Sequence, residues 1–277
     1  MRLLKQLLPV MVVALVGGQL VTAVGDDALL RLVIGTVAAV LAVLVYAWTV
    51  RWSERRAPVE VALKGAPVRL GLGLLIGVAW FSAVIGNIAF NKDYRIDGFG
   101  SVSGPIGLFG FMAAAAVTEE LMFRGVLFRI MEGRTGTYVA MVVTSVLFGG
   151  YHLLNPDATL WGAIAIAVEA GGTLAAAYAA TRNLWVPIGL HFGWNFAEAA
   201  IFSTEVSGNG SNDGLLHSVM SGPAYITGGK FGPEASPSAV TFGVLLTIVF
   251  MWLAHRRGNV VPRRRSARVA AAQTLAQ

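Results

Sequence analysis

Cysteine is absent from the 277-residue chain, and charged residues are scarce. The lack of cysteine excludes disulfides, thiolate nucleophiles and cysteine-ligated metal sites. Asp, Glu, Lys and Arg make up 13% of the residues, whereas an ordinary soluble domain carries roughly a quarter. Hydrophobic residues make up 56%, so the composition is that of a membrane protein.

Apolar stretches recur that are long enough to cross a bilayer, which takes about 20 residues at the helical rise. None of them shows the strict alternation of polar and apolar residues that marks a membrane β-barrel. The sequence therefore predicts an all-α, polytopic membrane bundle of about eight transmembrane helices. The expected spans are residues 7–24, 29–50, 70–90, 105–130, 137–153, 158–180, 185–203 and 238–255.

Two polar segments interrupt this pattern. The basic segment from Arg51 to Arg69 separates an N-terminal helix pair and its loop (1–69) from an expected transmembrane core (70–255), which a basic tail follows (256–277). The segment 204–237 is rich in Gly and Pro. A loop of that length is either a functional lid or a passive connector, and the sequence leaves both open.

Positive charge is unevenly distributed along the chain. With a cytoplasmic N-terminus, all but four of the 21 Lys and Arg residues lie on the cytoplasmic side, the exceptions being Arg31, Lys92, Arg95 and Lys230. This asymmetry follows the positive-inside rule, so the net charge of +6 indicates topology and no nucleic-acid partner is expected. The tail sequence PRRRSAR is expected to bind anionic lipid headgroups.

The first apolar stretch has a basic start and small residues near Ala23, as a signal peptide does. We expect it to remain as an uncleaved helix, because the rest of the chain is membrane-embedded. With this helix retained and its N-terminus in the cytoplasm, the later loops lie on the sides that their charges favour. The Ala- and Gly-rich composition favours a bacterial plasma membrane, with both termini in the cytoplasm.

Ionisable side chains inside the expected spans are few, and each costs about 3 kcal/mol at the bilayer centre. Glu120 and Arg124 are four residues apart, so they can pair on one helix face. Glu119 is turned about 100° away and lacks a local partner. The pair alone is also compatible with a structural clasp or with arginine snorkelling, but neither explains Glu119.

Two further spans carry polar residues at the same spacing. His152 follows Phe148 by four residues, and Asn195 follows His191 by four. Each of these groups needs a polar partner in lipid, so the least costly arrangement is one shared cavity. There, Glu119 is suited to act as a general base, His152 to hold the attacking water, and His191 with Asn195 to donate hydrogen bonds to an oxyanion.

The same residues leave the cofactor open. Glu119, His152 and His191 are of the types that bind Zn²⁺, so the alternatives are no cofactor or a zinc ion on these three. An H-E-x-x-H helix, which favours zinc, is absent, and so is a G-x-S-x-G serine elbow.

Three motifs in order carry a resemblance to a known family: EELMFR (119–124), FGGYH (148–152) and HFGWN (191–195). Together with the approach GTLAAAYAATRNLWVPIGLHFGWN, they resemble the CPBP (CAAX protease and bacteriocin-processing, or Abi) intramembrane endopeptidases over residues 105–203. Eukaryotic members remove the last three residues of prenylated CAAX proteins, and some bacterial members are linked to bacteriocin immunity or maturation. The implied substrate is a peptide or protein in the membrane, including lipid-modified ones.

The resemblance also implies roles for the motif residues. Glu119 activates water, Glu120 and Arg124 shape the site, His152 helps to hold the water, and His191 with Asn195 forms the oxyanion pocket. The family has been described both as metalloproteases and as metal-free glutamate proteases, and we favour the second.

Two other functional classes use similar residues. A transporter or channel also buries Glu, His and Arg, but the inverted repeats and broken helices that favour it are not visible. A non-catalytic membrane scaffold is the third alternative. The presence of every motif residue argues against it, because a scaffold does not need a complete catalytic set. Outside the motifs, Glu169 is expected either in the cavity or beside a local partner, and Glu198 at a helix end away from the site.

Overall fold

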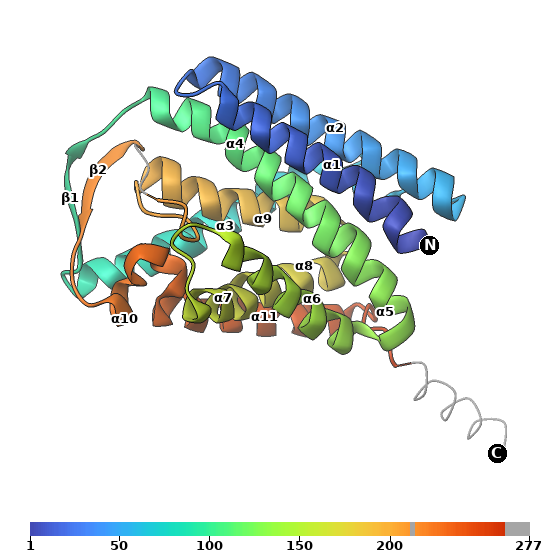
Figure 1. The fold of residues 1–277 in the computed structure, drawn as a ribbon. Coiled ribbons are helices and arrows are strands. Elements are labelled where there is room, and N and C mark those ends of the chain that lie inside the picture. The colour runs from blue at the N-terminus through green and yellow to red at the C-terminus, as the bar shows by residue number, and fades with distance from the viewer. Residues whose placement is uncertain (211–213, 264–277) are drawn as a thin grey trace, which may run out of the picture.

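Helices dominate the computed structural model, which describes residues 1–210 and 214–263 (Figure 1). The first half contains α1 (Arg2–Ala23), α2 (Ala28–Glu54), η1 (Val59–Val61), α3 (Ala66–Phe90), β1 (Tyr94–Phe99), α4 (Ser103–Glu120), η2 (Leu121–Phe128) and α5 (Arg129–Thr135). There follow α6 (Thr137–Tyr151), η3 (His152–Leu154), α7 (Leu160–Ile166), η4 (Ala167–Gly171), α8 (Gly172–Thr181), α9 (Trp185–Phe196) and η5 (Ala197–Ile201). The last elements are β2 (Leu216–Met220), α10 (Ala224–Thr227), η6 (Gly229–Phe231), η7 (Pro233–Ala235) and α11 (Pro237–Arg256).

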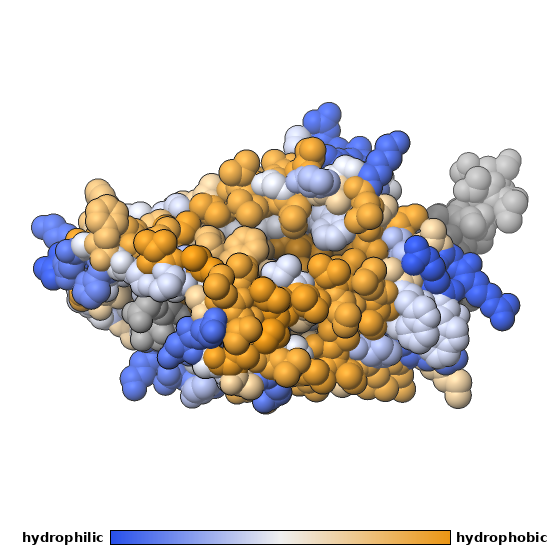
Figure 2. Space-filling model, turned by 90° about the horizontal axis from the view of Figure 1, so that it is seen from above, coloured by the Kyte–Doolittle hydropathy of each residue, from blue (hydrophilic) through white to orange (hydrophobic). Residues whose placement is uncertain are grey.

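Seven helices in the described residues are long and apolar enough to cross a membrane. They are Arg2–Ala23, Ala28–Glu54, Ala66–Phe90, Ser103–Thr135, Thr137–Leu154, Leu160–Thr181 and Pro237–Arg256. Apolar side chains cover the middle of the face drawn in Figure 2, and hydrophilic ones gather mostly toward its ends. The chain is therefore an integral membrane protein, and the predicted all-α polytopic bundle is confirmed.

The expected span at 185–203 differs from the other spans. It is helical, but α9 has 12 residues and the π-helical η5 adds five, which is shorter than the other candidate spans. Every residue from Val186 to Asn195 is buried. Because α9 is enclosed by protein, its length does not have to match the thickness of the lipid core.

Close backbone contact fixes α9 against α3. Each helix contributes two glycines spaced by four residues: Gly73, Gly77, Gly189 and Gly193. A Cβ atom on Gly77 would lie 2.2 Å from the carbonyl oxygen of Leu190. Small residues at this spacing let membrane helices approach closely, so the two glycine pairs hold in place the helix that carries His191 and Asn195.

Three segments of the bundle have π-helical rather than α-helical hydrogen bonding: η2, η4 and η5. Each contains a buried ionisable residue, respectively Arg124, Glu169 and Glu198. Single turns of π-helix are rare and often occur at functional sites. The bundle is therefore irregular at the positions where its polar side chains are buried.

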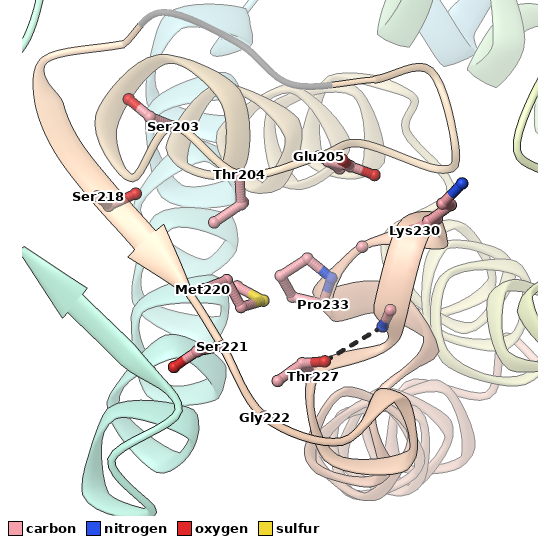
Figure 3. A pocket seen from close by; sticks show the side chains of 12 residues that line it. Ser203, Thr204, Glu205, Ser218, Met220, Ser221, Gly222, Thr227, Lys230 and Pro233 are labelled. Carbon is pink, nitrogen blue, oxygen red and sulfur yellow. Dashed lines mark hydrogen bonds between the residues drawn. The ribbon is translucent and has the colours of Figure 1, made fainter.

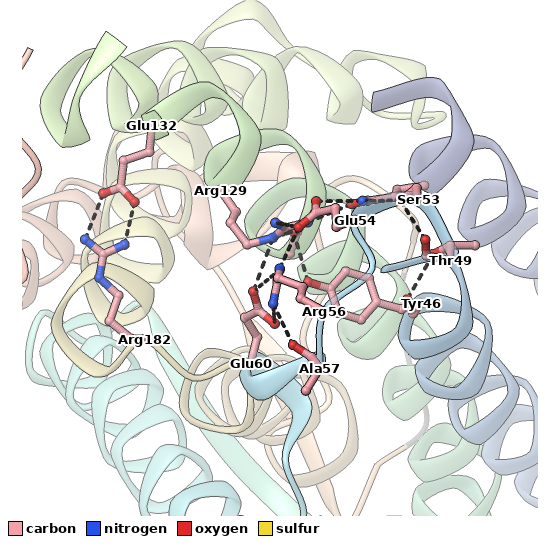
Figure 4. Close-up of polar contacts among 12 residues, drawn as sticks. Tyr46, Thr49, Ser53, Glu54, Arg56, Ala57, Glu60, Arg129, Glu132 and Arg182 are labelled. Carbon is pink, nitrogen blue, oxygen red and sulfur yellow. Dashed lines mark hydrogen bonds and ion pairs between the residues drawn. The ribbon is translucent and has the colours of Figure 1, made fainter. Parts of the chain in front are cut away.

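A network of ion pairs joins the N-terminal helix pair to the core near α5 (Figure 4). Arg129 donates to Glu54 at 2.9 Å and to Gln6 at 2.7 Å, which links α5 to both α1 and α2. Arg56 donates to Glu54 at 2.6 Å and to Glu60 at 2.5 Å. The network is partly buried, so it fastens α1 and α2 to the bundle instead of leaving them as a separate unit.

The other end of the bundle carries a small two-stranded sheet (Figure 1). β1 lies between α3 and α4, and it pairs antiparallel with β2, with Tyr94 opposite Met220. β2, α10, η6 and η7 all belong to the segment 204–237. Residues 204–210 and 214–237 of that expected loop are therefore structured and packed on the bundle. The basic tail was expected over residues 256–277, and residues 264–277 lie outside the described part of the chain.

We expect Gly77→Ala to lower the stability of the protein. The added methyl overlaps the backbone of α9, and overpacking of this kind costs about 1–3 kcal/mol. Gly71→Ala is the matched control in the same helix, because a Cβ there meets nothing within 4 Å. Thermal unfolding in detergent should give a lower midpoint for Gly77→Ala alone, and equal midpoints for the two variants would contradict the close packing.

Candidate active site

The two glutamates of the first motif, Glu119 and Glu120, both lie beside the imidazole of His191. The Glu120 Oε1 atom lies 2.7 Å from Arg124 Nη1 and 2.9 Å from His191 Nδ1. Glu119 Oε2 lies 3.9 Å from the other ring nitrogen, Nε2 of His191. The neighbouring glutamates of α4 therefore reach the two nitrogens of one histidine on α9.

Arg124 is only 1% exposed, and its terminal nitrogens have partners on several segments. Besides Glu120, its guanidinium donates to the carbonyl oxygen of Gly171 at 3.2 Å. Its Cζ atom also lies 4.4 Å from the centroid of the Phe148 ring, which is cation–π geometry. A buried guanidinium requires such partners, so Arg124 ties α4, α6 and η4 together below the site.

Phe148 organises the histidines of the second and third motifs. Its carbonyl oxygen accepts a hydrogen bond from His152 Nδ1 at 2.8 Å, because a carbonyl can only accept. Its ring contacts the rings of His152 and His191 with centroid distances of 4.8 Å and 5.9 Å. With Nδ1 protonated, neutral His152 has its lone pair on Nε2, which can accept a hydrogen bond from water.

A small cavity of about 20 Å³, room for about one water molecule, lies among these residues. His152, His191 and Asn195 line it, together with Trp80, Phe148, Ile166, Ala170, Leu174, Leu190, Trp194, Ser207 and Glu234. Glu119, Glu120 and Arg124 do not line the cavity but meet it through His191. The structure thus brings all six residues of the three motifs to one site between α4, α6 and α9.

Glu119 and Glu120 have different surroundings. Glu120 is fully buried and bound to Arg124 and His191. The Oε2 atom of each lacks a hydrogen-bond partner among the described residues, but the Glu119 side chain is 14% exposed and that of Glu120 is 0% exposed. Of the two carboxylates, Glu119 is therefore the one available to a water molecule.

A three-ligand metal site is not formed by these side chains. Within residues 1–210 and 214–263, no group of three His, Asp or Glu residues is arranged to hold a metal ion.

Four buried residues differ from the sequence-based expectations. Glu198 is fully buried in η5 instead of lying at an open helix end, and Glu169 is fully buried in η4 without lining the cavity. Glu234 and Ser207 line the cavity but were not anticipated. They come from an aperiodic segment, and only the apolar context of Glu234, between Pro233 and Ala235, hinted at burial.

A second, larger hollow of about 410 Å³ opens at the sheet end of the bundle (Figure 3). Its lining includes Ser203, Glu205, Ser218, Thr227, Lys230 and Pro233. Burial and the charge of Asp157 raise the pKa of Glu205, although Lys230 opposes this. Pro233 faces the hollow while the next residue, Glu234, lines the inner cavity, so the short helix η7 separates the two spaces.

Gly232 allows η7 to begin where it does. Its φ angle is 106°, and a Cβ atom there would lie 2.3 Å from the carbonyl oxygen of Glu205. Only glycine adopts such a conformation without strain. The turn at Gly232 therefore places Glu234 in the lining of the cavity.

Comparisons with known proteins agree with this membrane fold and its buried polar site. Residues 101–197 match the type II CAAX prenyl endopeptidase Rce1-like family. The chain is also 27% identical over 155 residues to a Bacillus subtilis (strain 168) protein named "Putative membrane peptidase YdiL". The match covers 51% of this chain and 61% of the length of that relative. No solved structure matches the chain.

These matches confirm the resemblance to the CPBP family that the three motifs indicated. The matched residues 101–197 contain all six motif residues. α1 and α2 lie outside the matched segment.

We expect Glu120→Gln and Glu119→Gln to affect stability very differently. Glu120→Gln removes the carboxylate that compensates buried Arg124, and breaking such a pair costs about 3–5 kcal/mol. Glu119→Gln removes no hydrogen bond to Oε2 and should cost much less. Unfolding in detergent measures both, and equal losses would contradict the assignment of Glu120 as the structural carboxylate.

Proposed function

We propose that the protein is an intramembrane endopeptidase that hydrolyses peptide bonds with a water molecule activated by Glu119. The observation that carries this proposal is the arrangement of Glu119 and Glu120 around His191, beside the cavity that His152 and Asn195 line. It offers a free base next to hydrogen-bond donors in a site enclosed by helices, which are the parts needed for acyl transfer. The family match and the similarity to YdiL support the same class.

In the proposed reaction, a water molecule in the cavity gives a proton to Glu119 as its oxygen attacks the substrate carbonyl. His152 accepts a hydrogen bond at Nε2 from the other O–H of the water, which stays on the new carboxyl group, because its Nδ1–H is bound to the carbonyl of Phe148. Protonated Glu119 then transfers its proton to the leaving amine. The balance is one water consumed and one peptide bond replaced by a carboxyl and an amine group.

His191 and Asn195 are proposed to stabilise the oxyanion. The Nδ1–H of His191 is used by Glu120, so His191 has a second donor, Nε2–H, only in its imidazolium form. Carboxylates near both nitrogens favour that form. The Asn195 amide, one helical turn further along α9, supplies the other donor.

The substrate is proposed to be a membrane peptide or protein, of CAAX type with a lipid modification or related to bacteriocin processing. The chain is proposed to reside in a bacterial plasma membrane with both termini in the cytoplasm. The distribution of Lys and Arg supports this orientation. It puts the Arg129 network on the cytoplasmic side and the two-stranded sheet on the other.

Glu119→Gln should abolish cleavage while leaving the fold intact. Loss of a general base lowers the rate about 10²–10⁴-fold, and the uncharged amide cannot take the proton from water. Purified wild type and variant are compared in detergent on membrane-proteome peptides, with mass spectrometry of the new termini. Glu205→Gln, which changes a glutamate of the outer hollow, is the matched control and should cleave as wild type does.

Equal turnover by Glu119→Gln and wild type would remove Glu119 from the catalytic role. Proton flux coupled to substrate in liposomes, with no proteolysis, would favour a transporter instead.

We further propose that hydrolysis needs no metal ion. The expected result is full activity after treatment with a chelator and no stoichiometric zinc by elemental analysis of the purified protein. Activity that is lost on chelation and restored by Zn²⁺ would overturn this mechanism, because Glu119 would then act through a metal.

A further inference from the structure

The edge of β2 that faces away from β1 carries outward-pointing backbone groups. Ser221 donates its N–H to the carbonyl oxygen of Asp93 at 2.8 Å, so these two residues form a hydrogen-bonded pair across the sheet. Hydrogen-bonded and non-hydrogen-bonded pairs alternate in antiparallel strands, and the register is regular from Ser218 to Met220. Met220 and Ser218 are therefore in non-hydrogen-bonded pairs, and their N–H and C=O groups point away from β1.

These outward groups have no partner in the described part of the chain. Neither the N–H nor the C=O of Ser218 and Met220 forms a hydrogen bond with a residue outside the sheet. The preceding outward residue, Leu216, differs, because its C=O accepts a hydrogen bond from the hydroxyl of Ser203 at 2.5 Å. The free edge thus begins after Leu216 and covers Ser218 to Met220, and an edge of this kind is a template for another strand.

The free edge of β2 borders the outer hollow. Ser218 and Met220 line this hollow, as do Lys230 and Pro233. In Figure 3, β2 runs along one side of the hollow, β1 lies beyond β2, and Lys230 and Pro233 lie on the other side. The volume of about 410 Å³ is within the range of ligand pockets, roughly 300–1,000 Å³, so there is room beside the edge for an added segment.

The rest of the lining suits a main chain better than a charged or bulky group. Gly222, Gly229 and Gly232 are part of it, and glycine allows another backbone to approach closely. Glu205 and Lys230 carry opposite charges in the same lining, so neither a cation nor an anion is favoured. The hollow is therefore fitted to a peptide that is recognised through its backbone.

The hollow is also next to the candidate active site. Pro233 faces the hollow and the next residue, Glu234, lines the inner cavity. Because the inner cavity has room for about one water molecule, the chain that flanks the bond to be cleaved must be held elsewhere. That chain has to leave its helix before the bond can react, and its freed N–H and C=O groups then need partners in a membrane.

We propose that the free edge of β2 binds the substrate as an added, extended strand in the outer hollow. This mode is β-strand addition, in which main-chain hydrogen bonds supply the affinity. The inference rests on the proposed peptidase function and adds the form in which that peptidase recognises its substrate. In the proposed orientation, the bound segment is the extracytoplasmic flank of the bond to be cleaved.

The first test compares two changes at one position of the edge. Met220→Pro removes the outward N–H but no bond to β1, and proline is tolerated at such edge positions. Met220→Ala removes the side chain and keeps the N–H, so it is the matched control. Both are made in Glu119→Gln protein, and melting temperatures in detergent show that they are folded.

The probe is a fluorescein-labelled, ten-residue peptide of alternating Thr and Val, which favour an extended chain. Fluorescence anisotropy measures its affinity for the two variants. We expect Met220→Pro to bind it at least about 5-fold more weakly than Met220→Ala, a factor equivalent to about 1 kcal/mol.

The second test leaves β2 unchanged, which serves if Met220→Pro does not fold. Two versions of the peptide carry N-methyl groups on every Val or on every Thr. Successive residues of a strand direct their N–H groups to opposite edges, so each version loses the donors of one edge. A slip of one residue would turn the other kind of side chain to the hollow. We expect one version to bind within about 2-fold of the parent peptide and the other at least about 5-fold more weakly.

Equal affinities of Met220→Pro and Met220→Ala for the probe would overturn the inference, and so would equal affinities of the two N-methylated versions. No measurable binding to Met220→Ala has the same meaning. A dimer in detergent that Met220→Pro dissociates would show that the edge pairs with a second copy of the chain, which also overturns the proposal.

Failure of this inference is distinguishable from failure of the peptidase proposal. If protein with an intact Glu119 cleaves peptides with the same KM whether or not it carries Met220→Pro, only the strand addition is excluded. If the probe binds with the expected pattern but wild-type protein cleaves no peptide, the binding edge is sustained and the peptidase proposal fails.

Discussion

The buried ion pair between Glu120 and Arg124 is the interaction on which the candidate site depends. A guanidinium in the middle of a membrane bundle is tolerable only with a carboxylate and oriented carbonyl groups around it. Those partners come from α4 and η4, and Phe148 of α6 covers the guanidinium with its ring. The same carboxylate binds His191 of α9, so satisfying one arginine fixes the relative positions of four segments.

This arrangement divides the work between two adjacent glutamates. Glu120 has a structural role, because its Oε1 atom accepts hydrogen bonds from both Arg124 and His191. Glu119 remains uncommitted at the edge of the same imidazole. An adjacent pair in a helix points to different sides, so one carboxylate can hold the site together while its neighbour is left for chemistry.

Hydropathy and the cost of burial predicted much of this from the sequence. The apolar stretches located the spans, and the need of Glu120, His152 and His191 for partners in lipid predicted that their helices meet. The sequence predicted a membrane span at 185–203, where the structure has the enclosed helix α9. An apolar run has the same composition whether it faces lipid or protein. The enclosure of α9 shows in the burial of every residue from Val186 to Asn195, which depends on helices that are distant in the sequence.

The parts that escaped prediction depend on tertiary packing of irregular segments. Glu234 follows a Gly-Pro pair in a stretch without periodicity, and only the folded turn after Gly232 shows that its side chain enters the cavity. Glu198 was expected at a helix end, one turn beyond Asn195 and away from the site. In the structure the helix continues as η5, and that turn buries the carboxyl group completely.

The π-helical turns have a consequence for how this bundle tolerates insertions and deletions. A π-bulge amounts to one residue more than an α-helix needs to cover the same length. Removing a residue from η4 would let the segment return to ordinary helix with its flanks nearly in place, but it would displace the groups that the bulge itself presents. Since η4 supplies both the carbonyl groups that cradle Arg124 and the buried Glu169, chain length there is under tighter constraint than side-chain identity at most lipid-facing positions.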